Sequence, residues 1–479
     1  MANPDHLTNP GFLASRRQLL QWGGSSCLGL TLAGLMRAQS AIADSAVQRE
    51  GASKIRSCIL LFYYGGPSHL DTYDMKPNAS SAIRGDFQPI ATSAPDVQVC
   101  EHLPHMSKLM HKVALIRSMH HGNRLHDSAS INSLTGRPSP TGDREEAVPA
   151  KQVFPCYGAT LSHLLRERDL DASHAALPFV FHNVVDVPCQ GAGFLGTTFD
   201  PMQITVDPEL GTYHVGALSR QDALSIDRIS QRRRLLGQLD IAVQTTQASA
   251  QFRRFYDRAY RFLSSIDLPH ALDLSTEPLA VRKRYGLYSS QQYIDDHTTG
   301  GDPNDGIACN MRGQNLLLAR RLVEMGVPFV NVYDYKQQGL NWDTHARNFD
   351  LHKTQLLPLA DQSLSALIED LDQRGLLEST LVVAMGEFGR SPKINANAGR
   401  DHWPDCYTVL LAGGGVKGGY VHGESDRIGA FPDKDGVTPA DLAATIFWRF
   451  GIPASTEIHD LTGRPWRVAE GQPIKQAFV

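Results

Sequence analysis

Long apolar runs alternate with amphipathic segments along most of this 479-residue chain. Uninterrupted apolar strands are typical of a sheet that is buried on both faces. Between the runs, residues 314–326 and 356–375 place leucines at helical spacing. The alternation predicts an α/β fold with a mostly parallel sheet and helices on both faces. The clearest apolar runs are CILLFYY, VALIRSM, VPFVNVYD, TLVVAM and YTVLLAGGG.

The pattern changes between about residues 215 and 270, where RISQRRRLLGQLDIAV and QFRRFYDRAYRFL are basic and helical in spacing. Ile229, Leu236, Leu239 and Val243 fall on one stripe of such a helix. We interpret the arginine run as a solvated helix face and the whole segment as a helical insertion. Residues 44–479 are then expected to form a single α/β domain that contains this insertion.

The first 43 residues have the character of a targeting segment. Arg16 and Arg17 precede a moderately apolar stretch, CLGLTLAGL, and the small residues Ala41–Ala43 precede Asp44. The apolar stretch is too short to span a bilayer as a permanent anchor. The pattern predicts a twin-arginine signal peptide over residues 1–43 and a periplasmic or secreted mature protein. Because this route exports folded proteins, often with a cofactor already inserted, it suits a metalloprotein.

Charge and cysteine usage exclude several functional classes. A formal net charge of −4 and a pI near 6.5 give no general attraction to nucleic acid or acidic membranes. The mature chain contains no predicted transmembrane segment. Once the signal is removed, the remaining cysteines form no CxxC pair, which argues against a zinc finger or a redox motif. The 19 histidines, many of them beside aspartates, instead indicate a metal site.

Histidine and carboxylate residues gather at the ends of five predicted strands. Open α/β sheets bind ligands outside the carboxyl ends of their strands, where imidazole and carboxylate groups can hold a divalent cation. An aspartate after a strand commonly serves a turn, so each position alone is a weak signal. Together they predict a site for zinc, manganese, calcium or magnesium. The candidate ligands are Asp71, His126, Asp343, His345, Glu387, Asp401 and His402.

Longer motifs carry a family resemblance over nearly the whole mature chain. These motifs include LLFYYGGPSHLDTYDMKP, LTGRPSP, GAGFLGTTFDP, NWDTH, GEFGRSP and GRDHWP. Together they resemble an exported bacterial family known as domain of unknown function 1501. That family is similar in fold to the alkaline phosphatase and sulfatase superfamily. The resemblance implies an alkaline phosphatase-like sheet, metal ligands on strand ends and hydrolysis of phosphate or sulfate esters.

The resemblance also implies roles for four of the candidate ligands. TLVVAMGEFG resembles the superfamily strand that ends in an Asp-His or Asp-Asn pair, which implicates Glu387. RDHWP resembles the loop that supplies the last histidine, which implicates His402. NWDTH resembles an earlier Asp…His ligand motif, which implicates Asp343 and His345.

Two departures from the superfamily pattern leave the number and identity of the metal ions open. Asp343 and His345 are separated by one residue, where the superfamily motif has three. The superfamily places an aspartate directly at the end of the first strand, whereas Gly65 and Gly66 intervene here before Asp71.

The segment HDSASINSLTGR, residues 126–137, resembles the end of the superfamily's nucleophile helix. Counting back about ten residues from Gly136 reaches His126, which leaves three roles open: metal ligand, phosphohistidine-type nucleophile or helix-capping group. A rival frame takes DSA as Asp-Ser-Ala and makes Ser128 the nucleophile. In that frame the distance from Ser128 to Gly136 is two residues shorter than the superfamily spacing. A slip of two residues along a helix turns a side chain by roughly half a circle.

Two functions are consistent with these residues. The first is an exported metal-dependent hydrolase of sulfate or phosphate esters, with polysaccharide among the candidate substrates and metal-activated water as the nucleophile. Arg390 or Arg137 would hold the anionic group in that case, or else Arg390 would serve as a structural partner for Glu387. The second is a non-catalytic relative that binds metal or glycan beside an envelope protein partner. The missing nucleophile favours the second function, and the many clustered ionisable groups favour the hydrolase, which we take as the working hypothesis.

Overall fold

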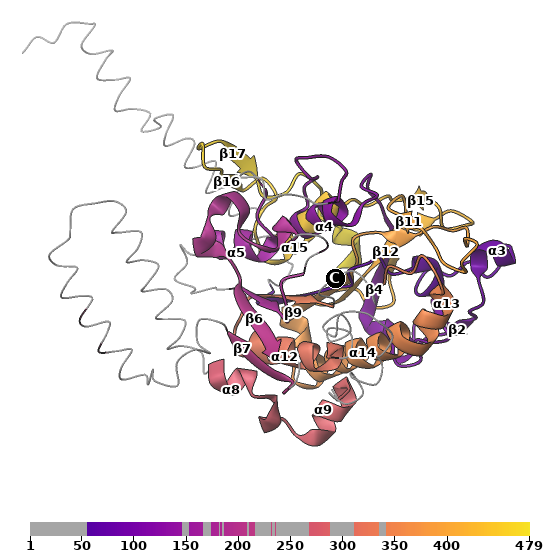
Figure 1. Ribbon diagram of the computed structural model, residues 1–479, viewed down its shortest axis with the longest axis horizontal. Helices are drawn as coiled ribbons and strands as arrows, with labels where there is room; N and C mark the ends of the chain where they lie inside the picture. Colours follow the sequence, from indigo (N-terminus) through magenta and orange to yellow (C-terminus); the bar gives the residue numbers. More distant parts are fainter. Residues whose placement is uncertain are drawn as a thin grey trace, which may run out of the picture. The chain divides into compact units, whose positions relative to one another are not determined.

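Figure 1 shows the computed structural model of the chain, coloured from the N-terminus to the C-terminus. The structure describes residues 55–145, 153–165, 174–207 apart from 182, 184 and 185, 210–215, 231, 235, 268–287, 311–334 and 342–479. The predicted signal peptide lies outside the described residues, as does nearly all of the predicted helical insertion.

A nine-stranded sheet forms the centre of the described structure. Only β12 and β7 run against the direction of the other strands. The predicted fold class, a mostly parallel sheet in an α/β protein, is therefore confirmed. In spatial order the strands are β13 (Val421–His422), β4 (Val113–Met119), β12 (Tyr407–Gly413), β9 (Thr380–Met385), β1 (Ser57–Phe62), β8 (Phe329–Tyr333), β5 (Ala175–Leu177), β6 (Met202–Asp207) and β7 (Thr212–Val215).

Helices cover both faces of this sheet (Figure 1). All six residues of β1 are buried, and their side chains alternate between two apolar cores, as the pleat of a strand requires. Ile59 and Leu61 belong to the core that contains α12 and α14, whereas Leu60 and Phe62 belong to the core that contains α4, α5 and α15. These helices are α12 (Arg312–Glu324), α14 (Leu357–Gln373), α4 (His126–Thr135), α5 (Tyr157–Leu165) and α15 (Pro439–Arg449).

Shorter elements complete the described structure. A π-helical turn over His352–Leu356 joins α13 to α14. The other short helices are α3 (Ser81–Arg84), α8 (Leu268–Leu272), α9 (Leu279–Tyr285) and α13 (Asn348–Leu351). Four two-stranded sheets pair β2 (Pro89–Ala91) with β3 (Gln98–Cys100), β10 (Gly389–Arg390) with β11 (His402–Trp403), β14 (Glu424–Ser425) with β15 (Pro432–Lys434), and β16 (Glu457–His459) with β17 (Pro465–Arg467).

The predicted strands and helices occur where the apolar patterns placed them. All five apolar runs form strands of the central sheet, and the two leucine-rich segments form α12 and α14. Cys58 is fully buried in β1. Among the described residues, no helix has the length and apolarity needed to cross a membrane.

The direction of the strands gathers distant segments at one edge of the sheet. β1, β4, β8 and β9 all end at this edge, and the loops that carry the candidate ligands follow them. β12 runs in the opposite direction, so the residues that precede it, including β11, reach the same edge. The edge predicted from the sequence therefore collects side chains that are up to several hundred positions apart.

Candidate metal centre

Three side chains from three separate segments meet at this edge of the sheet. His126 is the first residue of α4, Asp343 lies in the loop after β8, and His402 lies in β11. One ligand atom of each residue lies within 4.8 Å of the ligand atoms of the other two. His126 is buried, whereas Asp343 and His402 are half-buried.

His345 adds a fourth side chain, on the more open side of the group. Its Nε2 lies 2.9 Å from Nε2 of His402 and 3.1 Å from Oδ1 of Asp343, while Nε2 of His402 lies 3.2 Å from the same oxygen. Ligands of a tetrahedral ion bound at about 2.0–2.1 Å lie about 3.3 Å apart. The three atoms are thus close to one face of a coordination tetrahedron, and these residues fit a divalent cation.

His126 lies between two carboxylates. Its Nδ1 lies 2.6 Å from Oε1 of Glu387, and its Nε2 lies 3.3 Å from Oδ2 of Asp343. Burial lowers the pKa of His126, but the two carboxylates outweigh burial and raise the pKa to about 9. A proton or a cation at Nε2 therefore stabilises this arrangement, and a cation that binds His126 must displace that proton.

Asp343 is the centre of the group. Burial alone would raise the pKa of this carboxyl, but His126, His345 and His402 surround it and hold the pKa far below its ordinary range. Burial lowers the pKa of His402, and the bond to Asp343 only partly offsets that effect. An ionised Asp343 facing neutral His402 is the combination that a cation requires.

Arg390, predicted to hold an anionic substrate group, is fully buried. Its guanidinium donates to Asp343 Oδ1 at 2.5 Å, to the backbone carbonyls of Gly65 and Gly66, and to that of Arg400. Its donors are therefore engaged by the protein. Arg390 thus supports the Asp343 carboxylate from within the protein.

Ser128, the alternative nucleophile, does not point at the group. Its hydroxyl donates to Asp143 Oδ1 at 2.5 Å and to the Leu125 carbonyl at 3.1 Å. The segment itself is the predicted helix, and Gly136 ends it with a left-handed φ of 68°. His126 faces Asp343 and Ser128 is turned toward Asp143, as expected for side chains two residues apart on a helix.

Asp71, expected as a ligand, lies outside the group. Its carboxylate is fully buried and accepts bonds from Arg400 at 2.7 and 3.0 Å, from Ser68 at 2.6 Å and from Asn348 at 2.9 Å. Burial raises the pKa of Asp71, but the Arg400 guanidinium more than compensates and keeps that pKa below its ordinary value. Asp71 thus forms a structural ion pair under the site.

Glu387 and Asp401 each contact one histidine of the group. Glu387 is buried and, within the group, is bonded only to Nδ1 of His126. Asp401 is exposed, and its Oδ1 lies 3.1 Å from Nδ1 of His345. This contact lowers the pKa of Asp401, and the bond to Asp343 raises the pKa of His345. Both carboxylates therefore lie behind histidines and away from the ligand atoms.

Several residues that support the site carry no sequence signal of that role. Asp143 Oδ1 and Oδ2 accept the backbone N–H groups of Leu125 and Arg124, and Glu145 Oε1 accepts that of His126. These carboxylates cap the start of α4, whose first N–H groups have no partner within the helix. Asp143 and Glu145 lie in a proline-broken loop in which only charge is visible from the sequence.

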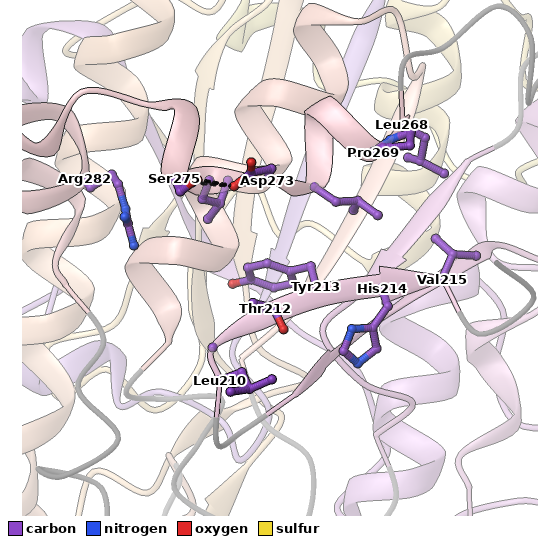
Figure 2. Close-up of a pocket in the computed structure, with 13 residues that line it drawn as sticks. Leu210, Thr212, Tyr213, His214, Val215, Leu268, Pro269, Asp273, Ser275 and Arg282 are labelled. Atoms are coloured by element: carbon purple, nitrogen blue, oxygen red, sulfur yellow. Dashed lines mark hydrogen bonds between the residues drawn. The ribbon is translucent and has the colours of Figure 1, made fainter. Parts of the chain in front are cut away.

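A hollow of about 490 Å³ lies against β7 and α8 (Figure 2). Tyr213 and His214 come from β7, and the Asp273 carboxylate accepts bonds from Ser275 beside it. None of the residues that line it belongs to the metal group. The hollow and the metal group are therefore separate features of the fold.

Comparison with known families identifies the family of this chain. A family described as "Protein of unknown function (DUF1501)" matches residues 55–478, nearly all of the described structure. The chain belongs to the DUF1501 family. The family resemblance inferred from the motifs is thereby confirmed. The comparison with curated proteins finds no match to this chain.

Solved structures similar to this DUF1501 chain include two enzymes of known source. Lipoteichoic acid synthase LtaP from Listeria monocytogenes is 11% identical over 84% of this chain and 73% of its own, with a TM-score of 0.37. The PsFucS1 sulfatase from Pseudoalteromonas sp. is 13% identical over 87% of this chain and 72% of its own, with a TM-score of 0.35. A mutant of alkaline phosphatase PafA is 8% identical over 89% of this chain and 99% of its own, with a TM-score of 0.44. We therefore base the function on the geometry of this chain's own residues.

Proposed function

We propose that this chain is an exported hydrolase of phosphate or sulfate esters that uses one divalent cation. His126, Asp343 and His402 hold the cation, and His345 is the fourth ligand. The observation that carries the proposal is that one carboxylate, Asp343, faces three imidazole nitrogens at 3.1–3.3 Å. An imidazole-rich set favours zinc over manganese, calcium and magnesium, which prefer oxygen ligands.

The protein residues orient the site, and the cation supplies the chemistry. When bound here, a divalent cation that accepts a water as a further ligand would lower the pKa of that water toward neutrality and would polarise an ester oxygen. His345 is 46% exposed, against 17% for His402 and 1% for His126, so the substrate approaches from the side of His345. Asp401 fixes the ring of His345 through Nδ1. The ester class follows from the motif resemblance to the alkaline phosphatase and sulfatase superfamily.

The arrangement favours direct attack by water over a covalent intermediate. Ser128 is bonded to Asp143, and His126 presents Nε2 toward Asp343 and Nδ1 toward Glu387, so neither offers a free nucleophile. A phosphohistidine-type role would require His126 to leave both carboxylates. The role of metal ligand, one of the three that the sequence leaves open for His126, is the one supported by these contacts.

A second candidate function has its own supporting observation. Arg390 and Arg137 are buried and bonded to the protein, and the exposed Arg124 pairs with Asp405 at 2.5 Å. The two buried guanidinium groups, of Arg390 and Arg137, are therefore not free to hold an anionic ester. This favours a non-catalytic relative in which the same site binds metal or glycan, beside a protein partner in the cell envelope.

Metal analysis combined with an ester panel separates the two functions. The mature protein would be purified, its metal content measured, and hydrolysis of aryl sulfates and aryl phosphates followed before and after chelation. The hydrolase requires one ion per chain, loss of that ion in Asp343→Asn, and hydrolysis that returns with added zinc or manganese. A metal-loaded protein that is inactive on every ester supports the binding function, and a folded protein that takes up no metal refutes the hydrolase and the metal-binding form of the second function.

Export by the twin-arginine route also remains a proposal, because residues 1–43 lie outside the described structure. Substitution of both Arg16 and Arg17 by lysine is expected to leave the full-length precursor in the cytoplasm. Arg49→Lys, placed after the predicted cleavage site, is the matched control and should not affect export. N-terminal sequencing of the exported protein tests whether the mature chain begins at Asp44.

A further inference from the structure

We infer that Glu387 is a positioning residue for His126 and is not itself a metal ligand. It acts from the side of the imidazole opposite to the cation. The inference rests on the metal site proposed above and is independent of ester hydrolysis.

The two nitrogens of His126 face different carboxylates. Nδ1 lies 2.6 Å from Glu387 Oε1, and Nε2 lies 3.3 Å from Asp343 Oδ2. These two nitrogens point away from each other across the imidazole ring. A cation bonded to Nε2 and Asp343 therefore has the ring of His126 between itself and Glu387. Glu387 accordingly does not belong to the group whose ligand atoms lie within 4.8 Å of one another.

Glu387 is anchored at both its side chain and its backbone. Oε1 also accepts the backbone N–H of Gly65 at 2.8 Å. The Glu387 carbonyl accepts from His121 Nε2 at 2.6 Å and from the Ser133 hydroxyl at 3.2 Å. These bonds connect the end of β9 to the loop after β1, the loop after β4 and the body of α4. A glutamate held at its backbone by two segments and at its carboxylate by Gly65 presents a fixed acceptor to the histidine ring.

A fixed acceptor at Nδ1 determines the chemistry at Nε2. When Nδ1–H donates to Glu387, the neutral ring must carry its lone pair on Nε2, which is the atom that faces Asp343. Carboxylates in this position fix the tautomer and orientation of a metal-binding histidine and raise its basicity, and their loss typically weakens metal binding about 10–100-fold. Glu387 thus prepares His126 for the cation without touching it.

The structure also indicates a mild substitution for the test. Oε2 of Glu387 has no hydrogen-bond partner among the described residues. In Glu387→Gln the amide oxygen can keep both Oε1 contacts while the amide nitrogen occupies the position of Oε2. Glu387→Ala removes the acceptor altogether, and His126→Ala removes the proposed ligand. Glu277→Gln is the matched control, because Glu277 is another largely buried carboxylate, paired with Arg320 and Arg321 in a separate network.

The experiment measures zinc affinity by competition with a chromophoric chelator, and the absorption spectrum of the cobalt-loaded protein. We expect Glu387→Gln to bind about tenfold more weakly and Glu387→Ala about 100-fold more weakly than the unmodified chain. At saturating cobalt, both Glu387 variants should retain one ion per chain and the absorption spectrum of the unmodified chain, since the metal ligands are unchanged. His126→Ala should change the spectrum, and Glu277→Gln should leave both affinity and spectrum unchanged.

Several results would overturn the inference. One is a cobalt-saturated Glu387→Gln protein whose absorption spectrum is altered in the same way as that of His126→Ala. Another is a zinc affinity of Glu387→Gln within twofold of the affinity of the unmodified chain. Two ions per chain in the unmodified protein and one in Glu387→Gln would make Glu387 a ligand of a second ion. Far-UV circular dichroism verifies folding, and if Glu387→Ala does not fold, the milder glutamine variant decides. If the unmodified chain binds metal but hydrolyses no ester, the hydrolase proposal fails and the role of Glu387 stands.

Discussion

His345 and His402 direct their Nε2 atoms at each other across 2.9 Å, and both face the same oxygen of Asp343. Two imidazole lone pairs repel at this distance, so the pair needs a shared proton or a shared cation. Asp343, ionised and facing both rings, adds negative charge at the same point. A divalent cation satisfies all three atoms at once, which a single proton does not.

This relationship predicts unequal effects of removing the two histidines. We expect His402→Ala to weaken zinc binding about 100-fold or more and His345→Ala about tenfold, because His402 is mostly buried and His345 is 46% exposed. Water can take over the coordination position of an exposed ligand more readily. Competition with a chromophoric chelator measures both affinities. His459→Ala, an exposed histidine in β16, is the control, and equal effects of all three substitutions would contradict the site.

Ser128→Ala distinguishes water attack from a serine nucleophile. We expect this variant to keep its metal and its ester hydrolysis, since the hydroxyl is bonded to Asp143 and to the Leu125 carbonyl. Loss of these bonds at the start of α4 should lower the free energy of unfolding by about 1 kcal/mol, measured by urea denaturation. A variant that remains folded and metal-loaded but loses hydrolysis would restore Ser128 as the nucleophile.

The strands and the edge that carries the site could be predicted because both are encoded locally. The apolar run of β1 predicts a strand buried on both faces, and Asp343 and His402 follow from their places near strand ends. The partners of buried charges could not be predicted in this way, because the tertiary fold selects them. Asp71 pairs with Arg400, 329 positions away, and no spacing within the sequence signals that choice.

The same limit applies to Glu387 and Arg390. Both residues follow a buried strand. The sequence pattern predicted Glu387 as a metal ligand and Arg390 as an anion-binding group. Their actual contacts depend on which ring and which backbone carbonyls reach them. The sequence therefore identified the residues at the site more reliably than their roles.

Asp71→Asn tests whether this carboxylate serves structure or metal binding. The Asp71–Arg400 pair is fully buried, so removing one charge should lower the free energy of unfolding by about 3–5 kcal/mol. The folded fraction should still bind one ion, because Asp71 lies outside the metal group. Asp350→Asn removes an exposed pair with Arg347 and should cost less than about 1 kcal/mol. A stable Asp71→Asn protein without metal would show instead that Asp71 is a ligand.

His352 should make the protein less stable in mild acid. Burial lowers the pKa of this fully buried histidine to about 4, and its Nδ1 lies 2.7 Å from the Asn348 carbonyl. In the unfolded chain a histidine has a pKa near 6.5. Between pH 6.5 and 4, His352 therefore holds more protons in the unfolded state than in the folded state. The stability attributable to His352 is therefore fully present above pH 6.5 and falls by about 3 kcal/mol as the pH approaches 4. Urea denaturation of the unmodified chain and of His352→Gln at several pH values isolates this effect. The difference in stability between the two proteins should shrink in acid, and a difference independent of pH would mean that folding does not change the pKa of His352.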